Sequence, residues 1–171
     1  MEKEFIPVNV ALLTISDTRT LETDTSGKVL RERVLAENHL VSDQQIVRDD
    51  MYQIRAIISH WIADPDIQAI ITTGGTGLTG RDGTPEAVSV LLDKEIIGFG
   101  ELFRQISYQD IRTSTIQSRA IGGVANGTFI FCLPGSSGAC KTAWDDILKD
   151  QLDHRHRPCN FVELMPRLLE K

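Results

Sequence analysis

Apolar runs of strand length alternate with amphipathic stretches of helix length through the first half of the sequence. The run at 8–15 (VNVALLTI) is nearly continuous and contains β-branched residues, which is typical of a strand buried on both faces. Further strand candidates lie at 39–47 and 67–73, and the stretches at 28–37 and 52–63 carry apolar residues at helical spacing. Strands that alternate with helices pair in parallel through right-handed crossovers. The pattern therefore predicts an α/β fold, a three-layer sandwich around a mostly parallel sheet.

The second half of the sequence contains a hairpin signal. Two short β runs at 121–124 and 128–133 flank the dipeptide Asn126-Gly127, which favours a tight two-residue turn between antiparallel strands. The sheet is therefore expected to be mixed, with an antiparallel pair near one edge.

Capping residues predict where the helices begin. Thr25 or Ser26 is expected to cap the first helix. Thr84 is the expected N-cap of a helix with Pro85 at its first position, where the missing N–H costs nothing, and this helix should end near Leu92. Two more helices are expected, at 99–111 and 139–152.

Length and charge exclude several classes of protein. A chain of 171 residues with 41% hydrophobic residues suits one domain over 1–171. The net charge of −6, with scattered Lys and Arg, argues against nucleic-acid binding. No run approaches the ~18 apolar residues of a membrane helix, and the start MEKEFIP lacks the apolar core of a signal peptide. A cytoplasmic protein is expected.

The cysteine and histidine pattern does not favour a structural metal site. Cys132, Cys140 and Cys159 fall in no CxxC spacing, and an odd count without a signal peptide fits reduced thiols better than disulfides. His154 and His156 near Cys159 could be zinc ligands, but their spacing matches no standard site. We expect a polar C-terminal segment there, not a zinc site.

Two glycine-containing loops follow strand candidates and precede helix starts. The first is TTGGTGLTGRDGTPEA at 72–87, and the second is PGSSG at 134–138. At such a junction, unpaired backbone N–H groups and the positive end of a helix meet at the carboxyl edge of the sheet, which is how proteins bind phosphate. The alternative is that both loops are only tight turns. Four glycines from Gly74 to Gly80 are more than one turn requires, so a phosphate site is the preferred interpretation.

Neither loop is a Walker A motif. Gly75 to Gly80 has the glycine spacing but is followed by Arg81-Asp82, and 135–142 ends in Lys-Thr but has Cys140 in place of the second glycine. Arg81 and Lys141 remain candidates for phosphate contact.

Carboxylates beside a phosphate site predict a divalent cation. Asp82 would repel a phosphate unless a cation lay between them, and Mg²⁺ commonly binds through one or two carboxylates together with substrate phosphates. Asp49 or Asp50, after the second strand candidate, could face the same crevice. An exposed cap of the following helix is an equally good interpretation of that pair.

The motifs resemble those of the MoaB/MogA family of molybdenum cofactor (molybdopterin) biosynthesis proteins. GGTG followed by RDxTPEA is a specific signature, and the resemblance covers essentially the whole chain. The matching segments are TISDT at 14–18, DTSG at 24–27, TTGGTG at 72–77, RDGTPEA at 81–87, GFGELFR at 98–104, QSRAIGGV at 117–124 and LPGSSGAC at 133–140.

The resemblance implies a molybdopterin-binding (MogA-like) fold and a set of functional residues. In catalytic members the two loops hold molybdopterin and ATP with Mg²⁺, so Asp82 and Asp49 would be the catalytic, metal-linked carboxylates. Ser118 and Arg119 match a Ser-Arg pair near the pterin site. The expected substrate-binding residues are Thr73, Gly74, Gly75, Thr76, Gly77, Arg81, Thr84, Pro85, Glu86, Ser118, Arg119, Pro134, Gly135, Ser136 and Ser137.

Two functions from different classes follow from the resemblance. The sequence is closest to the MoaB branch, through the EFIP start and the closing segment Asp153 to Phe161, and some members of that branch have lost the aspartates. Because this chain keeps both Asp49 and Asp82, the preferred hypothesis is a molybdopterin adenylyltransferase that uses MgATP. The alternative is a non-catalytic module that binds molybdopterin or a nucleotide.

Family members are trimers or hexamers, and an apolar cluster in the 99–111 segment predicts where the subunits would meet. This cluster is more apolar than one amphipathic helix needs; it consists of Phe99, Leu102, Phe103, Ile106 and Tyr108. Trp61 and Trp144, by contrast, are expected in the core.

Overall fold

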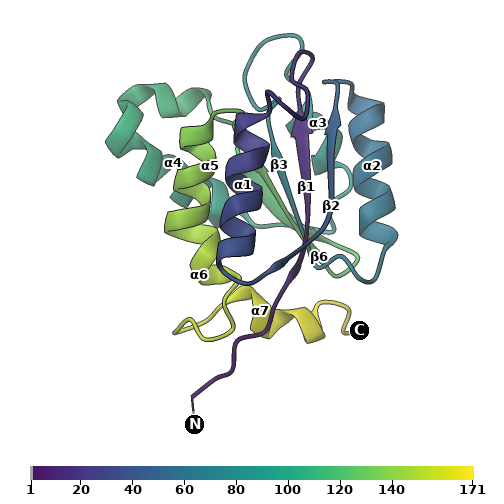
Figure 1. Ribbon diagram of the computed structural model, residues 1–171, viewed down its shortest axis with the longest axis vertical. Helices are drawn as coiled ribbons and strands as arrows, with labels where there is room; N and C mark the ends of the chain where they lie inside the picture. The colour runs from purple at the N-terminus through teal and green to yellow at the C-terminus, as the bar shows by residue number, and fades with distance from the viewer. Residues whose placement is uncertain (1) are drawn as a thin grey trace.

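A computed structural model describes residues 2–171 and contains one mixed six-stranded sheet (Figure 1). The strand order is β2-β1-β3-β6-β5-β4; β2, β1, β3 and β6 run parallel, and β5 and β4 continue the sheet in antiparallel pairing. The strands are β1 (Asn9–Ile15), β2 (Leu40–Val47), β3 (Ala69–Thr73), β4 (Lys94–Glu95), β5 (Ile121–Ala125) and β6 (Thr128–Leu133). The predicted antiparallel pair near one edge is confirmed.

Helices cover both faces of the sheet, so the three-layer prediction is also confirmed. Figure 1 shows α1, α4 and α5 on one side of the strands and α2 on the other. The α-helices are α1 (Thr25–Ala36), α2 (Met51–Ala63), α3 (Thr84–Ser89), α4 (Ile97–Ile111), α5 (Ser137–Ala143), α6 (Lys149–Gln151) and α7 (Phe161–Leu164). The remaining helical segments are η1 (Arg112–Gln117), η2 (Trp144–Leu148) and η3 (Met165–Arg167).

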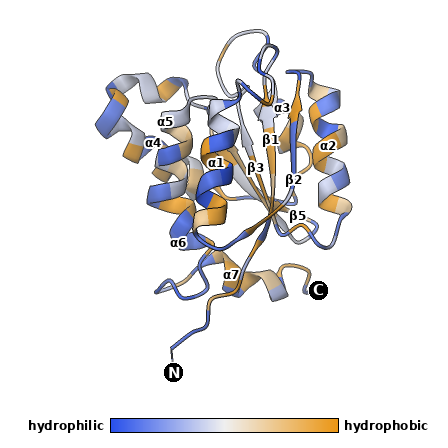
Figure 2. Cartoon of the chain, viewed as in Figure 1, coloured by the Kyte–Doolittle hydropathy of each residue, from blue (hydrophilic) through white to orange (hydrophobic). Residues whose placement is uncertain are grey.

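Two apolar cores fill the spaces between the layers. Along β1, Val10 and Leu12 face the core under α1, α4 and α5, whereas Ala11 and Leu13 face the core under α2 and α3. This alternation is the two-residue repeat of a strand covered on both faces, and Figure 2 shows the hydrophobic strands between helices with polar outer surfaces. Trp144 belongs to the first core and Trp61 to the second; each is 1% exposed, as predicted.

The hairpin turn between β5 and β6 has the predicted residues in the expected conformation. Asn126 has φ +47° and Gly127 has φ +81°, and both central residues of the favoured tight hairpin turn require positive φ. The pairing of Ala125 with Thr128 leaves a two-residue loop.

Several predicted helix boundaries were wrong. Asp24, not Thr25 or Ser26, caps α1, because its carboxylate accepts a hydrogen bond from the Gly27 N–H (2.9 Å) and another from the Thr14 hydroxyl (2.6 Å). Thr84 is the first residue of α3 and not its N-cap. That helix stops at Ser89 instead of continuing to about Leu92, and β4, η1 and α7 were not predicted.

The predicted oligomer cluster on α4 is divided by the fold. Phe99 and Phe103 are 3% and 1% exposed and pack in the chain's own core, so they are not available for a subunit contact. Leu102 and Tyr108 are 42% and 47% exposed. Ile116 on η1, the segment that follows α4, is 77% exposed.

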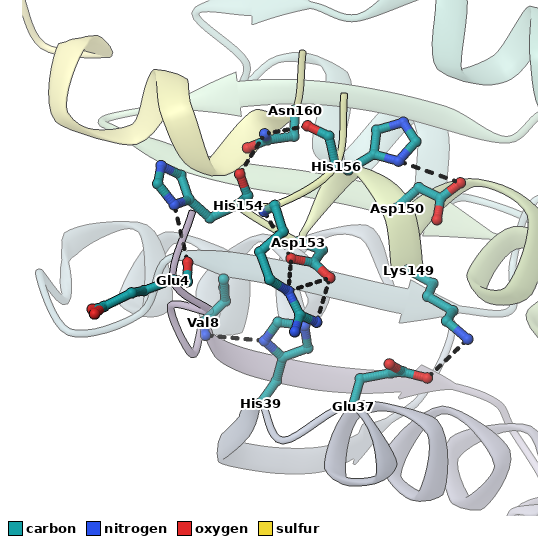
Figure 3. Close-up of polar contacts among 11 residues, drawn as sticks. Glu4, Val8, Glu37, His39, Lys149, Asp150, Asp153, His154, His156 and Asn160 are labelled. Atoms are coloured by element: carbon teal, nitrogen blue, oxygen red, sulfur yellow. Dashed lines mark hydrogen bonds and ion pairs between the residues drawn. The ribbon is translucent and has the colours of Figure 1, made fainter. Parts of the chain in front are cut away.

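The C-terminal segment lies beside the N-terminal residues and His39, at the end of the sheet away from the strand-end loops. Figure 3 shows His39 accepting a hydrogen bond from the Val8 N–H (3.1 Å) and Asn160 bonding the carbonyls of His154 and His156. The His156 ring lies 3.8 Å from Asp150, and the His154 ring contacts the Glu4 carbonyl. His154 and His156, which were weighed against a zinc site in the sequence, therefore face different partners.

Candidate functional site

A cavity of about 610 Å³ lies at the carboxyl ends of β1, β3 and β6. The chain leaves β1 toward β2 on one side and later returns to β3 on the other, so this is the point of the sheet where ligands bind in open α/β folds. The strand ends contribute Thr14, Ile15 and Thr73, and the two glycine-containing loops contribute the floor. The lining from these loops comprises Gly74, Gly75, Thr76, Gly77, Asp82, Pro134, Gly135, Ser136, Gly138 and Ala139.

The first loop requires glycine at its two leading positions. Gly74 has φ +107° and Gly75 has φ +70°, values that residues with a side chain rarely adopt. A Cβ on Gly74 would lie 2.1 Å from the Ile15 carbonyl oxygen, and a Cβ on Gly75 would lie 2.3 Å from the Thr84 hydroxyl. The loop therefore passes so close to β1 and α3 that only bare backbone fits.

The second loop packs directly against the first. A Cβ on Gly135 would lie 3.3 Å from the Gly74 Cα, and the Thr73 hydroxyl donates to the Pro134 carbonyl (3.0 Å). Ser136 caps α5 by accepting from the Ala139 N–H (3.1 Å). The ends of β3 and β6 thus present both loops to one cavity.

Asp82 lines the cavity and is held by its own loop. Its Oδ2 accepts hydrogen bonds from the Thr79 hydroxyl (2.7 Å) and the Thr79 N–H (2.9 Å). The hydrogen bond from the Thr79 side chain is the main cause that lowers the pKa of Asp82, against the opposing effect of burial. The carboxylate is therefore ionised and fixed in direction.

The structure separates the roles of Asp49 and Asp50. Asp50 caps α2 by accepting hydrogen bonds from the N–H groups of Tyr52 and Gln53. For Asp50, the alternative of an exposed helix cap is therefore correct. Asp49 instead faces the first loop, where its Oδ1 accepts from the Gly83 N–H (3.1 Å). Burial raises the pKa of Asp49, and the negative charges of Asp82 and Asp17 raise it further.

Arg81 lies outside the cavity lining and is paired with Asp17. Its guanidinium donates two hydrogen bonds to Asp17, at 2.9 and 2.7 Å, and this side-chain pairing lowers the pKa of Asp17. Asp17 also accepts from the Asp49 N–H (3.2 Å). Asp17 thereby connects the ends of β1 and β2 to the first loop.

Arg119 lies outside the cavity lining and holds the first loop by hydrogen bonds to its backbone. Its guanidinium donates to the carbonyl oxygens of Gly77 (2.9 and 2.6 Å) and Asp82 (3.1 Å), and it forms an ion pair with Glu86 in the first turn of α3. The adjacent Ser118 lines the cavity, and its buried Oγ has no hydrogen-bond partner among residues 2–171. Arg119 thus holds the first loop through hydrogen bonds, and its neighbour Ser118 contributes a buried, unpaired hydroxyl.

The cavity contains only part of the predicted substrate-binding set. The predicted residues that line it are Thr73, Gly74, Gly75, Thr76, Gly77, Asp82, Ser118, Pro134, Gly135 and Ser136. Those outside the lining are Asp49, Arg81, Thr84, Pro85, Glu86, Arg119 and Ser137. Lys141 also lies outside it, although its neighbour Thr142 contributes to the wall. Substrate contact for each of these residues stays a prediction.

Sequence reasoning missed one wall of the cavity, which belongs to α4 and η1. Phe103, Ser107, Asp110 and Ile111 line it from α4, and Ser114 and Gln117 continue it along η1. The α4 residues are spaced at i, i+4, i+7 and i+8, which places them on one helix face. That periodicity was the available signal, but the apolar members of the helix directed attention to a subunit contact.

The carboxylates suit a magnesium ion that is shared with a substrate. Asp49 and Asp82 each lie against a loop glycine, because a Cβ on Gly75 would be 2.7 Å from Asp49 Oδ2 and one on Gly77 would be 2.6 Å from Asp82 Oδ2. No group of three or more His, Cys, Asp or Glu side chains within the described chain could hold a metal ion by itself. Two carboxylates plus substrate phosphates are a common Mg²⁺ ligand set, so the residues fit that ion only together with a phosphate ligand.

Comparison with known proteins identifies relatives over most of the chain. The family model described as "Probable molybdopterin binding domain" matches residues 11–154. Molybdenum cofactor biosynthesis protein B of Escherichia coli (strain K12) is 54% identical over 158 residues, covering 92% of this chain and 93% of the relative. The protein of the same name from Bacillus cereus is 48% identical over 148 residues, covering 86% and 88%.

Solved structures show the same fold. A crystal structure of molybdenum cofactor biosynthesis protein B superposes with a TM-score of 0.85 at 46% identity, covering 88% of this chain and 94% of the other. The tungsten cofactor synthesizing protein MoaB from Pyrococcus furiosus gives a TM-score of 0.75 at 32% identity, covering 84% and 92%. A MogA structure gives 0.75 at 26% identity, covering 84% and 97%.

Proposed function

The chain belongs to the MoaB/MogA family of molybdenum cofactor biosynthesis proteins, and we propose that it binds molybdopterin in the cavity and transfers AMP from MgATP to the pterin's terminal phosphate. The comparisons support the molybdopterin-binding domain and the pathway. The nucleotide, the magnesium ion and the transfer reaction are our proposal.

One observation carries the catalytic proposal: an ionised carboxylate is fixed in the wall of the cavity, beside the glycine backbone of the first loop. Asp82 lines the same cavity as Gly75 and Gly77, and its direction is set by the two bonds from Thr79. An anion cradle that only bound phosphate would be weakened by such a charge. The charge becomes useful when a phosphate ligand brings a divalent cation with it.

The chain's own groups would mainly hold the two substrates. Loop N–H groups and the start of α5 would bind the pterin phosphate, whose oxygen attacks the α-phosphorus of ATP while the bond to pyrophosphate breaks. Holding the two substrates in line supplies much of the rate by proximity. Ser118 lines the cavity, but its Oγ is buried, so a substrate atom would reach this unpaired hydroxyl only after the side chain rotates.

Asp82 and Asp49 would hold the magnesium ion together with ATP phosphates. Such an ion supplies charge stabilisation for the phosphates and for the leaving pyrophosphate. Burial and the charges of Asp82 and Asp17 raise the pKa of Asp49, and a cation bound between the two carboxylates would oppose that effect. Arg119 would keep the loop that carries Asp82 in place through its bonds to Gly77 and Asp82.

A non-catalytic binding module is the second candidate, and two observations favour it. Asp49 does not line the cavity, and Oδ2 of Asp82 already accepts two hydrogen bonds from Thr79. A site of this kind would bind the pterin or a nucleotide without turning it over.

The decisive experiment is to incubate the purified protein with molybdopterin and MgATP and to measure pyrophosphate release. Wild type should release pyrophosphate only when Mg²⁺ is present, and Asp82→Asn should lower turnover by about a hundredfold or more with little change in pterin affinity. The control is Asp146→Asn, because Asp146 is exposed on η2 and lies outside the cavity. Absence of any Mg²⁺-dependent release by wild type would establish the binding module instead.

We further propose that the protein self-associates as a trimer or a dimer of trimers. Exposed apolar side chains on α4 and η1 support this, because Leu102, Tyr108 and Ile116 are between 42% and 77% exposed. Closed symmetry is the usual way to cover such a surface. Phe99 and Phe103 no longer belong to this proposal, since they are buried within the chain.

A further inference from the structure

The two sides of the cavity differ in their charged groups. The loop side carries the cation Arg19 and the carboxylate Asp82, whose Oδ2 already accepts two hydrogen bonds from Thr79. The α4 side carries Asp110, a carboxylate that takes part in none of the ion pairs formed by residues 2–171. Figure 1 shows α5 between α1 and α4, and α5 contacts both helices. Arg19 lies on the loop that leads to α1 and Asp110 lies on α4, so the two charged residues reach the cavity from different elements.

The wall around Asp110 suits a flat heterocycle with polar edges. Phe103 and Ile111 supply apolar surface on the same helix face, and Ser107 lies one turn from each of Phe103 and Ile111. Ser107 is 6% exposed and Asp110 is exposed. Small-molecule sites typically combine such apolar surface with a few polar groups that fix orientation.

The lone carboxylate has to face the part of the ligand that donates hydrogen bonds. A phosphate beside Asp110 would be repelled, because this wall offers no cation. The aminopyrimidine ring of a pterin has the opposite property, since its 2-amino group and N3–H point in parallel along one edge. Two parallel N–H donors match the two oxygens of a carboxylate in the same way that a guanidinium does.

We propose that Asp110 is a specificity-determining residue that binds the 2-amino and N3–H edge of the pterin ring. The pterin then lies along α4 with its phosphate toward the two loops and α5. This inference rests on the proposed function only in taking molybdopterin as the ligand, and it requires neither ATP nor transfer.

The test uses two stable ring probes, 6-hydroxymethylpterin and 6-hydroxymethyllumazine. The lumazine has an oxygen in place of the 2-amino group, so a carboxylate that accepts from that amino group should reject it. A site built for a hydrogen bond discriminates strongly against an analogue that lacks it. Wild type is therefore expected to bind the pterin at least about tenfold more tightly than the lumazine, as measured by fluorescence titration.

Asp110→Asn should weaken pterin binding about tenfold, because the charge-assisted hydrogen bonds to the pterin are lost. It should also remove the preference for the pterin over the lumazine, because the amide N–H of asparagine can donate to the lumazine 2-oxygen. Asp110→Ala should also lose the pterin affinity, and the exposed position makes both variants suitable for folding checks by circular dichroism. Asp146→Asn is the matched control for loss of one exposed carboxylate. Binding of inorganic pyrophosphate, which probes the loop end, should be unchanged in all three variants.

Two outcomes would overturn the proposal in distinguishable ways. If wild type prefers the pterin and Asp110→Asn retains both the affinity and the preference, the assignment of Asp110 is wrong while pterin binding stands. If wild type binds neither ring probe at millimolar concentration, both this assignment and the molybdopterin part of the proposed function are wrong. Failure of AMP transfer alone leaves the ring assignment untouched.

Discussion

Replacing Gly74 with alanine tests the claim that the first loop is built around bare backbone. The φ of +107° is unfavourable for alanine by about 1–3 kcal/mol. The new Cβ would also lie 2.1 Å from the Ile15 carbonyl oxygen, so the loop or the end of β1 must move by roughly 1 Å to reach ordinary contact. Movement of this kind in a packed region costs about 1–3 kcal/mol and strains the Gly74 N–H bond to the Leu133 carbonyl (3.0 Å).

The expected total for Gly74→Ala is about 3 kcal/mol of unfolding free energy, a large part of the ~5–15 kcal/mol of a typical domain. With a urea slope of about 1–3 kcal/mol per molar, the unfolding midpoint should fall by roughly 1–3 M at fixed protein concentration. Gly80→Ala is the matched control, because nothing lies within 4 Å of its added Cβ, and its midpoint should stay the same or rise slightly. Equal midpoints for the two variants would refute the reasoning.

Two further predictions concern charge and assembly. Because burial and then Asp82 and Asp17 raise the pKa of Asp49, the folded state binds that proton more tightly than the unfolded state and loses stability as pH rises through the raised value. Asp49→Asn keeps an oxygen that can accept from the Gly83 N–H. This variant should have a higher urea midpoint than wild type at pH ~7, but the same midpoint at pH ~3, which is below the usual carboxyl pKa. An equal difference between variant and wild type at both pH values would contradict this. Ile116→Glu should lower the mass seen by sedimentation, since a buried unpaired carboxylate is costly. Leu21→Glu is the matched control and should leave the mass unchanged, because Leu21 is an equally exposed aliphatic residue outside α4 and η1. A wild-type monomer at micromolar concentration would rule out the assembly.

The parts of the fold that depend on local pattern were predictable from the sequence. The continuous apolar run at 8–15 identified the central strand β1, which is buried on both faces, and Asn126-Gly127 identified the β5–β6 turn. The helix caps were less predictable because tertiary contacts decide them. Asp24 caps α1 while its other oxygen bonds Thr14 at the end of β1, and Thr84 uses its hydroxyl to bond the Gly74 carbonyl (2.8 Å).

The α4 side of the site could not be reached from loop motifs. Phe103, Ser107, Asp110 and Ile111 become neighbours of the glycine loop only because α4 packs beside α5. On sequence alone the same stripe equally suggests a buried face or a subunit contact, and the structure shows that Phe103 serves the core. The periodicity of these side chains is that of any packed helix, so it does not distinguish a cavity wall from a core face.

The glycine pattern of the first loop also has two causes that the sequence cannot separate. Gly75 and Gly77 leave room for a ligand, but they equally leave room for the carboxylates of Asp49 and Asp82, which lie where their Cβ atoms would be. The loop therefore already holds two negative charges before any phosphate arrives, and like charges at such short range oppose binding. A phosphate can bind tightly here only if a cation is added between it and the carboxylates, or if it binds at the α5 side, where Ser136 and Gly138 line the wall. If Mg²⁺ raises the affinity for the pterin, the two aspartates bind the cation beside the phosphate. If Mg²⁺ has no effect, the phosphate binds at the α5 side and the aspartates take no part in binding.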